Sequence, residues 1–78
     1  MEEMLKTPKI TIIGSGYVGM SLGVLLGQKC EVTILEIDKV KVDKINKGVS
    51  PIKDSLIQEY LDTKEINIFA TLLPNEAL

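Results

Sequence analysis

Residues 9–19 read KITIIGSGYVG, and this stretch decides the fold of the chain. Its first part, Lys9–Ile13, is mostly β-branched and nearly all apolar, which is typical of a strand buried on both faces of a parallel sheet. The strand is expected to stop at Gly14. From Tyr17 to Gln28 apolar residues recur at helical spacing, so a helix is predicted there. The stretch therefore predicts a strand, a glycine-rich turn and a helix.

A second strand and a second helix are predicted further along the chain. Glu31–Ile37 is apolar in its middle and acidic at its far end, and it is predicted as the second strand. Asp38 can cap a helix that follows, and Gly48 is suited to end it.

The last third of the chain predicts two helices around a third strand. Ser55 and Gln58 have the spacing of a capping box, so a helix is expected to begin with Ser55 as its cap. Ile66–Thr71 alternates well enough for a strand, and Pro74 is placed to start another helix. The resulting βαβααβ order predicts an α/β protein: a partial Rossmann fold whose three parallel strands lie in the spatial order 3-2-1.

Composition limits what the chain can do. It has 78 residues, enough for one small domain, and its nine Lys and eleven Asp and Glu give a net charge of −2 with no Arg and no His. This charge balance argues against nucleic-acid binding, which requires a basic patch on the protein. With Cys30 as its one cysteine, the chain holds neither a His-based triad nor a Cys/His zinc site, and no metal ligand is predicted. The lone Cys30 favours a reducing compartment, so we predict a cytoplasmic location.

The uncharged run at residues 10–28 resembles a signal peptide or a short membrane span. Thr11, Ser15 and Ser21 and five glycines interrupt this run. Glu2 and Glu3 also make the leader less positive than an export signal requires. We therefore predict no membrane association.

The turn Gly14-Ser-Gly-Tyr-Val-Gly19 has the pattern G-x-G-x-x-G, which is weak by itself because glycines are common. Here it follows a predicted strand, opens a predicted helix, and has Glu36 twenty residues beyond Gly16. These three features together make the fingerprint of a dinucleotide-binding site.

Each part of the fingerprint has a physical reason. Gly14 permits a tight turn, Gly16 lets the backbone approach a pyrophosphate, and Gly19 lets the helix lie close on the sheet. The free N–H groups near Tyr17 and Val18 then meet the anion at the helix N-terminus. A carboxylate at residue 36 accepts hydrogen bonds from the ribose hydroxyls and repels a 2′-phosphate, so NAD is favoured over NADP as the cofactor.

Structural interpretations compete with these roles. The glycine turn fits plain strand-to-helix packing, and Glu36 fits a solvated strand end. Asp38 competes with Glu36 for the ribose, although a role as helix cap already explains it. From the residues alone, Lys41 is one of several surface lysines, and Cys30 lies at a helix-to-strand junction away from the predicted ligand.

Four segments together resemble a known family: GSGYVGMSL from Gly14, VTILEID from Val32, KVDKIN from Lys41 and VSPIKD from Val49. They are similar to the start of the UDP-glucose/GDP-mannose dehydrogenases, and the resemblance runs from Lys9 to the end of the chain. It implies an N-terminal domain that binds NAD and a C-terminal domain that binds the nucleotide sugar. Two hydride transfers to NAD then oxidise the sugar's C6 alcohol to a carboxylate, as from UDP-glucose to UDP-glucuronate, through a thioester on a catalytic Cys.

The resemblance also assigns roles by position. Gly14–Gly19, with Ser15 inside it and Val18 as a backbone contact, matches the pyrophosphate loop. Glu36 stands where the family usually has Asp, and Lys41 matches a basic residue on the adenosine side of NAD. The family's catalytic Cys, Lys and Asp lie far downstream, and Cys30 does not match their motif. The resemblance implies that this chain binds the ADP part of NAD and carries no catalytic residue.

We interpret residues 1–78 as the truncated N-terminal part of an NAD-binding Rossmann domain, with the substrate domain absent. A nucleotide sugar would then bind only the full-length parent. The alternative is a non-enzymatic dinucleotide-sensing regulatory module, which shares the strand, turn and helix plan but lacks an insertion like that around Ser50-Pro51-Ile52. The edge of the first strand is expected to be unpaired, so self-association is predicted.

Overall fold

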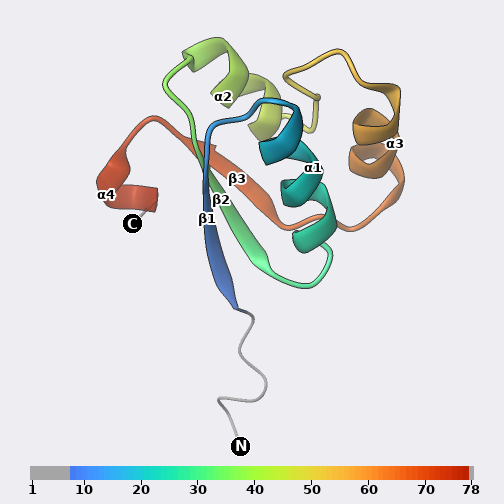
Figure 1. Cartoon of the computed structure of the whole chain (residues 1–78), viewed down its shortest axis with the longest axis horizontal. Helices are drawn as coiled ribbons and strands as arrows, with labels where there is room; N and C mark the ends of the chain where they lie inside the picture. The colour runs from blue at the N-terminus through green and yellow to red at the C-terminus, as the bar shows by residue number, and fades with distance from the viewer. Residues whose placement is uncertain (1–7, 78) are drawn as a thin grey trace, which may run out of the picture.

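The computed structural model of the protein describes residues 8–77. Its elements follow the predicted order of strands and helices (Figure 1). In chain order they are β1 (Lys9–Ile13), α1 (Tyr17–Leu26), β2 (Glu31–Leu35), α2 (Lys39–Asn46), α3 (Ser55–Thr63), β3 (Ile68–Thr71) and α4 (Pro74–Ala77).

The three strands form one open parallel sheet in the order β1-β2-β3. Ile12 of β1 is paired with Ile34 of β2, and Ile34 with Ala70 of β3. This confirms the predicted α/β class, the Rossmann-like topology and the spatial order 3-2-1. All three carboxyl ends therefore lie at one end of the sheet, where α/β proteins place their ligands.

The two faces of the sheet are covered unequally. Gly23 of α1 lies over the side chains of Ile12, Ile34 and Ile68, so α1 packs on that face. Thr11 points to the other face, because side chains alternate along a strand, and its hydroxyl donates to the carbonyl oxygen of Ala77 in α4. Figure 1 shows α4 apart from the other three helices. The first face thus carries the main core, and α4 covers part of the second.

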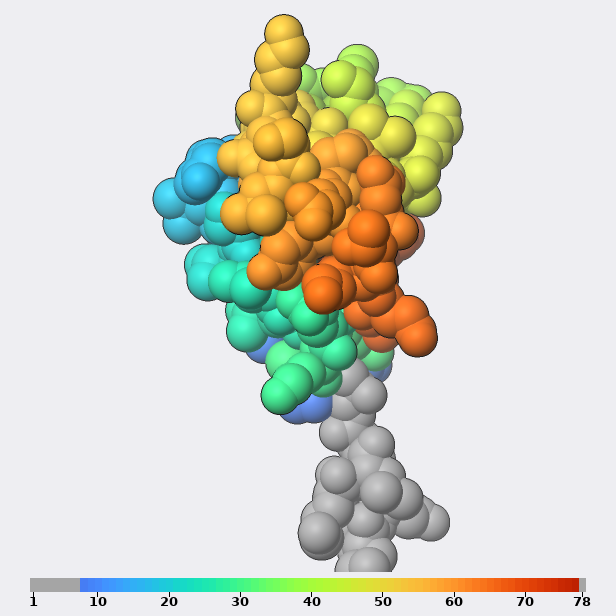
Figure 2. Space-filling model, turned by 90° about the vertical axis from the view of Figure 1, so that its right-hand side faces the viewer, coloured from blue at the N-terminus to red at the C-terminus, as the bar shows by residue number. Residues whose placement is uncertain are grey.

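The core combines the sheet with α1, α2 and α3. Its buried members come from all these elements: Met20, Val24, Val32, Ile34, Val42, Ile45, Ile57 and Ala70. Figure 2 looks onto α3 and shows it beside α1, with which it packs.

The apolar residues that predicted α1 do not all face the core. Val18 and Leu25 are 71% and 54% exposed, whereas Gly19 and Gly23 turn toward the sheet. A Cβ at Gly19 would lie 2.5 Å from the carbonyl oxygen of Gly14, so only glycine fits this approach. The predicted helix is confirmed, and it packs through Gly19 and Gly23 together with the buried side chains of Met20 and Val24.

Three predicted elements were each two residues too long at one end. The first helix ends at Leu26, the second strand at Leu35, and the third strand begins at Ile68. Asn67 N–H donates to the carbonyl oxygen of Gly27, which ties this part of the chain to the end of α1 before the strand begins.

The predicted caps are confirmed for one helix and wrong for another. Asp38 caps α2 by accepting a hydrogen bond from Val40 N–H, and Gly48 beyond α2 has φ +80°, where glycine is favoured. At α3 the cap is Asp54 and not Ser55, since the Asp54 carboxylate accepts from Ile57 N–H at 3.0 Å. Aspartate is an equally good cap, and Gln58 instead binds the preceding loop, where it accepts from Ser50 N–H and donates to Gly48 O.

The uncharged run of the sequence is divided between a strand and a helix. It supplies β1 and α1, and α1 has ten residues. No helix within residues 8–77 is both long enough and apolar enough to cross a bilayer.

Candidate dinucleotide-binding site

The turn between β1 and α1 lies at the carboxyl end of the sheet. Gly14 has φ +92°, in the left-handed region that favours glycine, and its N–H donates to the carbonyl oxygen of Leu35 at 2.8 Å. The tight turn expected at Gly14 is therefore present, in a conformation that would strain a residue with a Cβ. It bends the chain sharply from β1 into α1 while keeping the turn attached to the end of β2.

Gly16 leaves open space above the start of α1. A Cβ at this position would meet no described atom within 4 Å. Met20 N–H donates to Gly16 O, which makes this the first hydrogen bond within the helix. The N–H groups that precede it have no partner inside α1.

These helix donors are also left without a cap. Among residues 8–77, no side chain caps the N-terminus of α1, and its first turn carries no acidic residue. Free N–H groups and the positive end of the helix dipole thus face the space beside Gly16. A pyrophosphate fits both this room and these donors.

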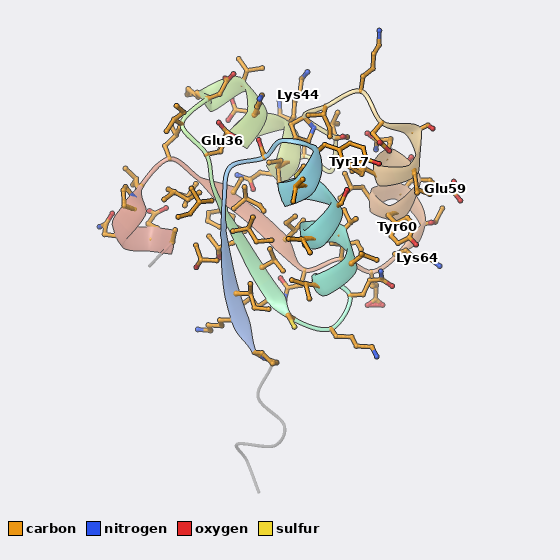
Figure 3. All side chains as sticks on the ribbon, in the orientation of Figure 1. Tyr17, Glu36, Lys44, Glu59, Tyr60 and Lys64 are labelled. Carbon is orange, nitrogen blue, oxygen red and sulfur yellow. The ribbon has the colours of Figure 1, made fainter. Side chains whose placement is uncertain are left out.

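Glu36 joins the glycine turn to the loop that follows β2. Its side chain is only 7% exposed. Oε1 accepts hydrogen bonds from the N–H of Ser15, at 2.9 Å, and from the Ser15 hydroxyl. Oε2 accepts from Asp38 N–H, also at 2.9 Å. Figure 3 shows Glu36 at the end of β2, next to the turn that leads into α1.

The surroundings of Glu36 favour its ionised form. Burial raises the pKa of Glu36, but hydrogen bonds from Ser15 and Asp38 and the positive charge of Lys41 lower it further than burial raises it. The net result is a pKa below the ordinary value, so Glu36 is a carboxylate at neutral pH. Lys41, half-buried on α2, is close enough to contribute to this effect.

The structure thus brings the predicted site residues together at one end of the sheet. Tyr17 and Val18 lie in the first turn of α1 with side chains 63% and 71% exposed, so they offer the site their backbone. The carboxylate of Asp38 caps its own helix, whereas the N–H of Asp38 donates a hydrogen bond to Glu36. Sequence reasoning missed this donor and the link from the Ser15 hydroxyl, because spacing does not show which way a side chain points.

Two hollows lie away from this turn. One of about 400 Å³ is at the amino end of β2, where Lys29, Cys30 and Asn67 line it. Cys30 is therefore at the opposite end of the strand from Glu36. The other, of about 200 Å³, is an apolar groove between α1 and α3 that includes Leu25 and Tyr60. Neither hollow contains a residue of the predicted site.

Comparison with known proteins identifies the family. The family profile described as "UDP-glucose/GDP-mannose dehydrogenase family, NAD binding domain" matches residues 8–74. The chain belongs to this family. Its match is to the NAD-binding domain, so NAD is the cofactor that family membership implies.

Curated relatives give the same result. A protein of Streptococcus pneumoniae named UDP-glucose 6-dehydrogenase is 54% identical over 66 residues, which cover 85% of this chain and 17% of that protein. Another so named, from Campylobacter jejuni, is 39% identical over 71 residues, covering 88% of this chain and 18% of its own length. A third, from Rickettsia conorii, is 47% identical over 53 residues, which cover 67% of this chain and 12% of that protein. The chain thus spans less than a fifth of these relatives.

Proposed function

We propose that this chain binds the ADP half of NAD at the turn between β1 and α1. The observation that carries the proposal is the uncapped N-terminus of α1, which opens beside the ionised carboxylate of Glu36. The free N–H groups of α1 suit a pyrophosphate, and the Glu36 carboxylate suits ribose hydroxyls. The separation of these two groups along the chain is that of the dinucleotide fingerprint.

Each site residue has a distinct part in this proposal. The N–H groups of Gly16, Tyr17 and Val18 hold the pyrophosphate. Gly14 and Ser15 form the turn that presents these groups, because their own N–H groups are already bonded to Leu35 O and Glu36 Oε1. Gly19 keeps α1 close enough to the sheet for those donors to reach the ligand. Glu36 accepts from the ribose hydroxyls, and Lys41 lies on the adenosine side.

The parent activity follows from the names of the relatives. We propose that the chain serves as the NAD-binding part of a UDP-glucose 6-dehydrogenase, which oxidises UDP-glucose to UDP-glucuronate with two NAD. When NAD is bound, it would accept the hydride. The described residues bind and orient the cofactor, and the nucleotide-sugar site and catalytic residues belong to further polypeptide. The domain assignment and the cytoplasmic location stay predictions.

Calorimetry of the purified chain with NAD and NADP tests the binding proposal. Because the Glu36 carboxylate repels a 2′-phosphate, NAD is expected to bind at least about tenfold more tightly, roughly 1.4 kcal/mol. Glu36→Ala should remove most of this preference, whereas Asp43→Ala, which removes an exposed carboxylate from the middle of α2, should keep it. Equal affinities in the wild-type chain would contradict the ribose assignment.

A second measurement tests whether this chain is catalytic. With NAD and UDP-glucose, the purified chain should give no absorbance from reduced nicotinamide. Alkylation of Cys30 should leave NAD binding unchanged, because Cys30 lies at the amino end of β2. Turnover that disappears in Cys30→Ser would overturn the non-catalytic assignment.

The open edge of β1 supports self-association as a further part of the proposal. Gly14 N–H donates to Leu35 O, so residues in register with Gly14 face β2 and the main-chain groups of Lys9, Thr11 and Ile13 point to the other side. No described strand pairs with that side. An unpaired row of N–H and C=O groups is a template for another chain.

The opposite edge of the sheet is protected. The side-chain amide of Asn46 accepts from the N–H of Ala70 at 2.7 Å and donates to its carbonyl oxygen at 2.9 Å. An α2 side chain thus takes the place of a neighbouring strand at β3. Self-association is therefore expected at the edge of β1 or at the thinly covered face of the sheet, and not through the edge of β3.

Sedimentation at micromolar concentration tests self-association. We expect a dimer or a larger species. Phe69→Lys places a charge on the thinly covered face, where Phe69 is 50% exposed, and should weaken association. Val40→Lys changes a residue of similar exposure, 61%, on α2 and should not. A monomer at every concentration would contradict this proposal.

A further inference from the structure

Ser15 stands inside the glycine turn but does not face the open space above it. Its side chain is 1% exposed, although both flanking glycines are more accessible. The hydroxyl donates to Glu36 Oε1, and the N–H of the same residue donates to the same oxygen. Both donors of Ser15 are therefore directed at the carboxylate rather than at the region where a pyrophosphate fits.

This arrangement makes the two oxygens of Glu36 unequal. Oε1 takes both hydrogen bonds from Ser15, whereas Oε2 takes one, from Asp38 N–H. A carboxylate offers about four acceptor positions, so one position remains, and it lies on Oε2. The oxygen that can receive a ribose hydroxyl is thus determined by which oxygen Ser15 engages.

A glutamate needs such a restraint to act as a ribose acceptor. Its side chain has three torsions, and ordering them on binding costs conformational entropy. Here the carboxylate is already held from two loops, by Ser15 before α1 and by Asp38 before α2. Because the carboxylate is ordered in advance, less entropy is lost when the ligand binds.

We propose that Ser15 is a positioning residue for the cofactor: its hydroxyl fixes the Glu36 carboxylate with Oε2 free for the ribose and so sets the preference for NAD over NADP. The proposal rests on the NAD site proposed above. It assigns to a side chain of the turn a role in selecting the ribose, beyond the backbone contacts expected of the turn.

The charges around Glu36 make the role measurable by titration. Lys41 of α2 is the charged group that acts on it, and α1 brings no acidic residue in its first turn. The carboxylate of Asp38 is directed to Val40 N–H. Loss of the Ser15 hydroxyl removes one cause that lowers the pKa of Glu36 and leaves burial in place, so the pKa should rise.

The experiment compares Ser15→Ala with the wild-type chain. This variant deletes the hydroxyl and keeps the backbone N–H, and Ser15→Gly serves the same purpose if the alanine variant does not fold. Carboxyl NMR follows the titration of Glu36 without ligand, and calorimetry measures NAD and NADP. Ser21→Ala, a serine of α1 at the groove toward α3, is the matched control.

Three results are expected of Ser15→Ala. The titration midpoint of Glu36 moves to higher pH, NAD affinity falls by roughly five- to tenfold, and NADP affinity falls less. In a Glu36→Gln background, Ser15→Ala should have no further effect on the ratio of the two affinities. Ser21→Ala should resemble the wild type in all three measurements.

The outcomes separate this inference from the proposed function. If the wild-type chain prefers NAD but Ser15→Ala leaves that preference and the Glu36 midpoint unchanged, the role of Ser15 alone is overturned. An equal loss of NAD and NADP affinity also overturns it, because a merely structural role would weaken both. If the wild-type chain binds neither nucleotide, the proposed function and this inference both fail.

Discussion

The N-termini of α1 and α2 begin beside the same end of the sheet but are built differently. Asp38 caps α2 by accepting from Val40 N–H at 2.9 Å, whereas α1 starts after Gly16 and, in the described part of the chain, has no side-chain cap. Every helix begins with N–H groups that lack a partner within it. The difference shows that α2 bonds one of its first N–H groups to its own cap, whereas the first N–H groups of α1 have no such partner and are free for the ligand that we propose.

Close packing on the sheet stabilises α1, which has no side-chain cap. Gly19 and Gly23 bring the helix so near the sheet that an added Cβ would lie 2.5 Å from Gly14 O and 3.0 Å from the Ile68 side chain. Each of the two helices also contributes two side chains to the buried core, Met20 and Val24 from α1 and Val42 and Ile45 from α2. The helix with free donors is therefore anchored by close contact with the sheet, which holds its N-terminus in place.

Capping α1 should have the largest effect. Gly16→Asp places a carboxylate where the pyrophosphate is proposed to bind, and that carboxylate would accept from the first-turn N–H groups. We expect NAD affinity to fall by about a hundredfold or more, roughly 2.7 kcal/mol. Gly16 has φ −74° and open space around it, so the fold should be unharmed.

Calorimetry and urea unfolding of the same variant check both halves of this prediction. Gly16→Ala, which adds a Cβ without a charge, is the control and should lose less affinity. Undiminished NAD binding by Gly16→Asp would show that the start of α1 is not the anion site.

The second-largest effect should come from the packing that anchors α1. In Gly19→Ala the new Cβ meets the backbone of Gly14, which cannot move without distorting the turn. We expect the free energy of unfolding to fall by about 2 kcal/mol, within the range known for overpacking. Urea unfolding measures it, with Gly16→Ala as the control for an added methyl group in open space. Equal stability of the two variants would mean that close packing does not hold α1.

The contrast between these termini was only partly predictable from sequence. Spacing was enough to locate the turn, the helix after it and Glu36, because a strand, a G-x-G-x-x-G pattern and an acidic strand end constrain one another. Asp38 was predictable as a cap because it directly precedes the helix. At α3 the capping-box spacing pointed to Ser55 as the cap, whereas Asp54 takes that place. The spacing did not show that Gln58 bonds to the preceding loop instead of to the helix start.

Side-chain direction is what the sequence could not supply. The apolar residues of α1 predicted a helix, but most of one stripe faces outward because the glycines occupy the packed side. The sequence shows that residue 15 is a serine but does not show whether its hydroxyl points to a ligand or to Glu36. The direction of a side chain depends on contacts between residues that are distant in the sequence. The hydrogen bond from Ser15 to Glu36, for example, joins residues 21 positions apart.

Removing the cap of α2 should have a smaller effect, and on stability alone. Asp38→Ala deletes the acceptor for Val40 N–H and should lower the free energy of unfolding by about 1 kcal/mol. The N–H of residue 38 is kept, so Glu36 keeps that donor and NAD affinity should change little. Urea unfolding and calorimetry give the two values. A large loss of NAD affinity would instead favour Asp38 over Glu36 as the ribose acceptor.

The smallest effect should be a pH dependence that Glu36, located between the two termini, gives to the fold. Hydrogen bonds from both loops and the Lys41 charge outweigh burial and lower the pKa of Glu36 from 4.5. The unfolded chain therefore takes up a proton at higher pH than the folded chain does. The stability that Glu36 contributes is complete above about pH 4.5 and is lost as the pH falls through the folded pKa.

Urea unfolding between neutral and acidic pH measures this loss. Glu36→Gln keeps the shape of the side chain without its charge, so the difference in unfolding free energy between it and the wild type should shrink below about pH 4.5. Asp43→Asn, at an exposed carboxylate on α2 that pairs with Lys39, is the matched control. A difference that stays constant over this range would mean that the links from Ser15 and Asp38 do not hold Glu36 in its charged form. The two loops would then lack the charged link that orders the ribose end of the site relative to the free donors of α1.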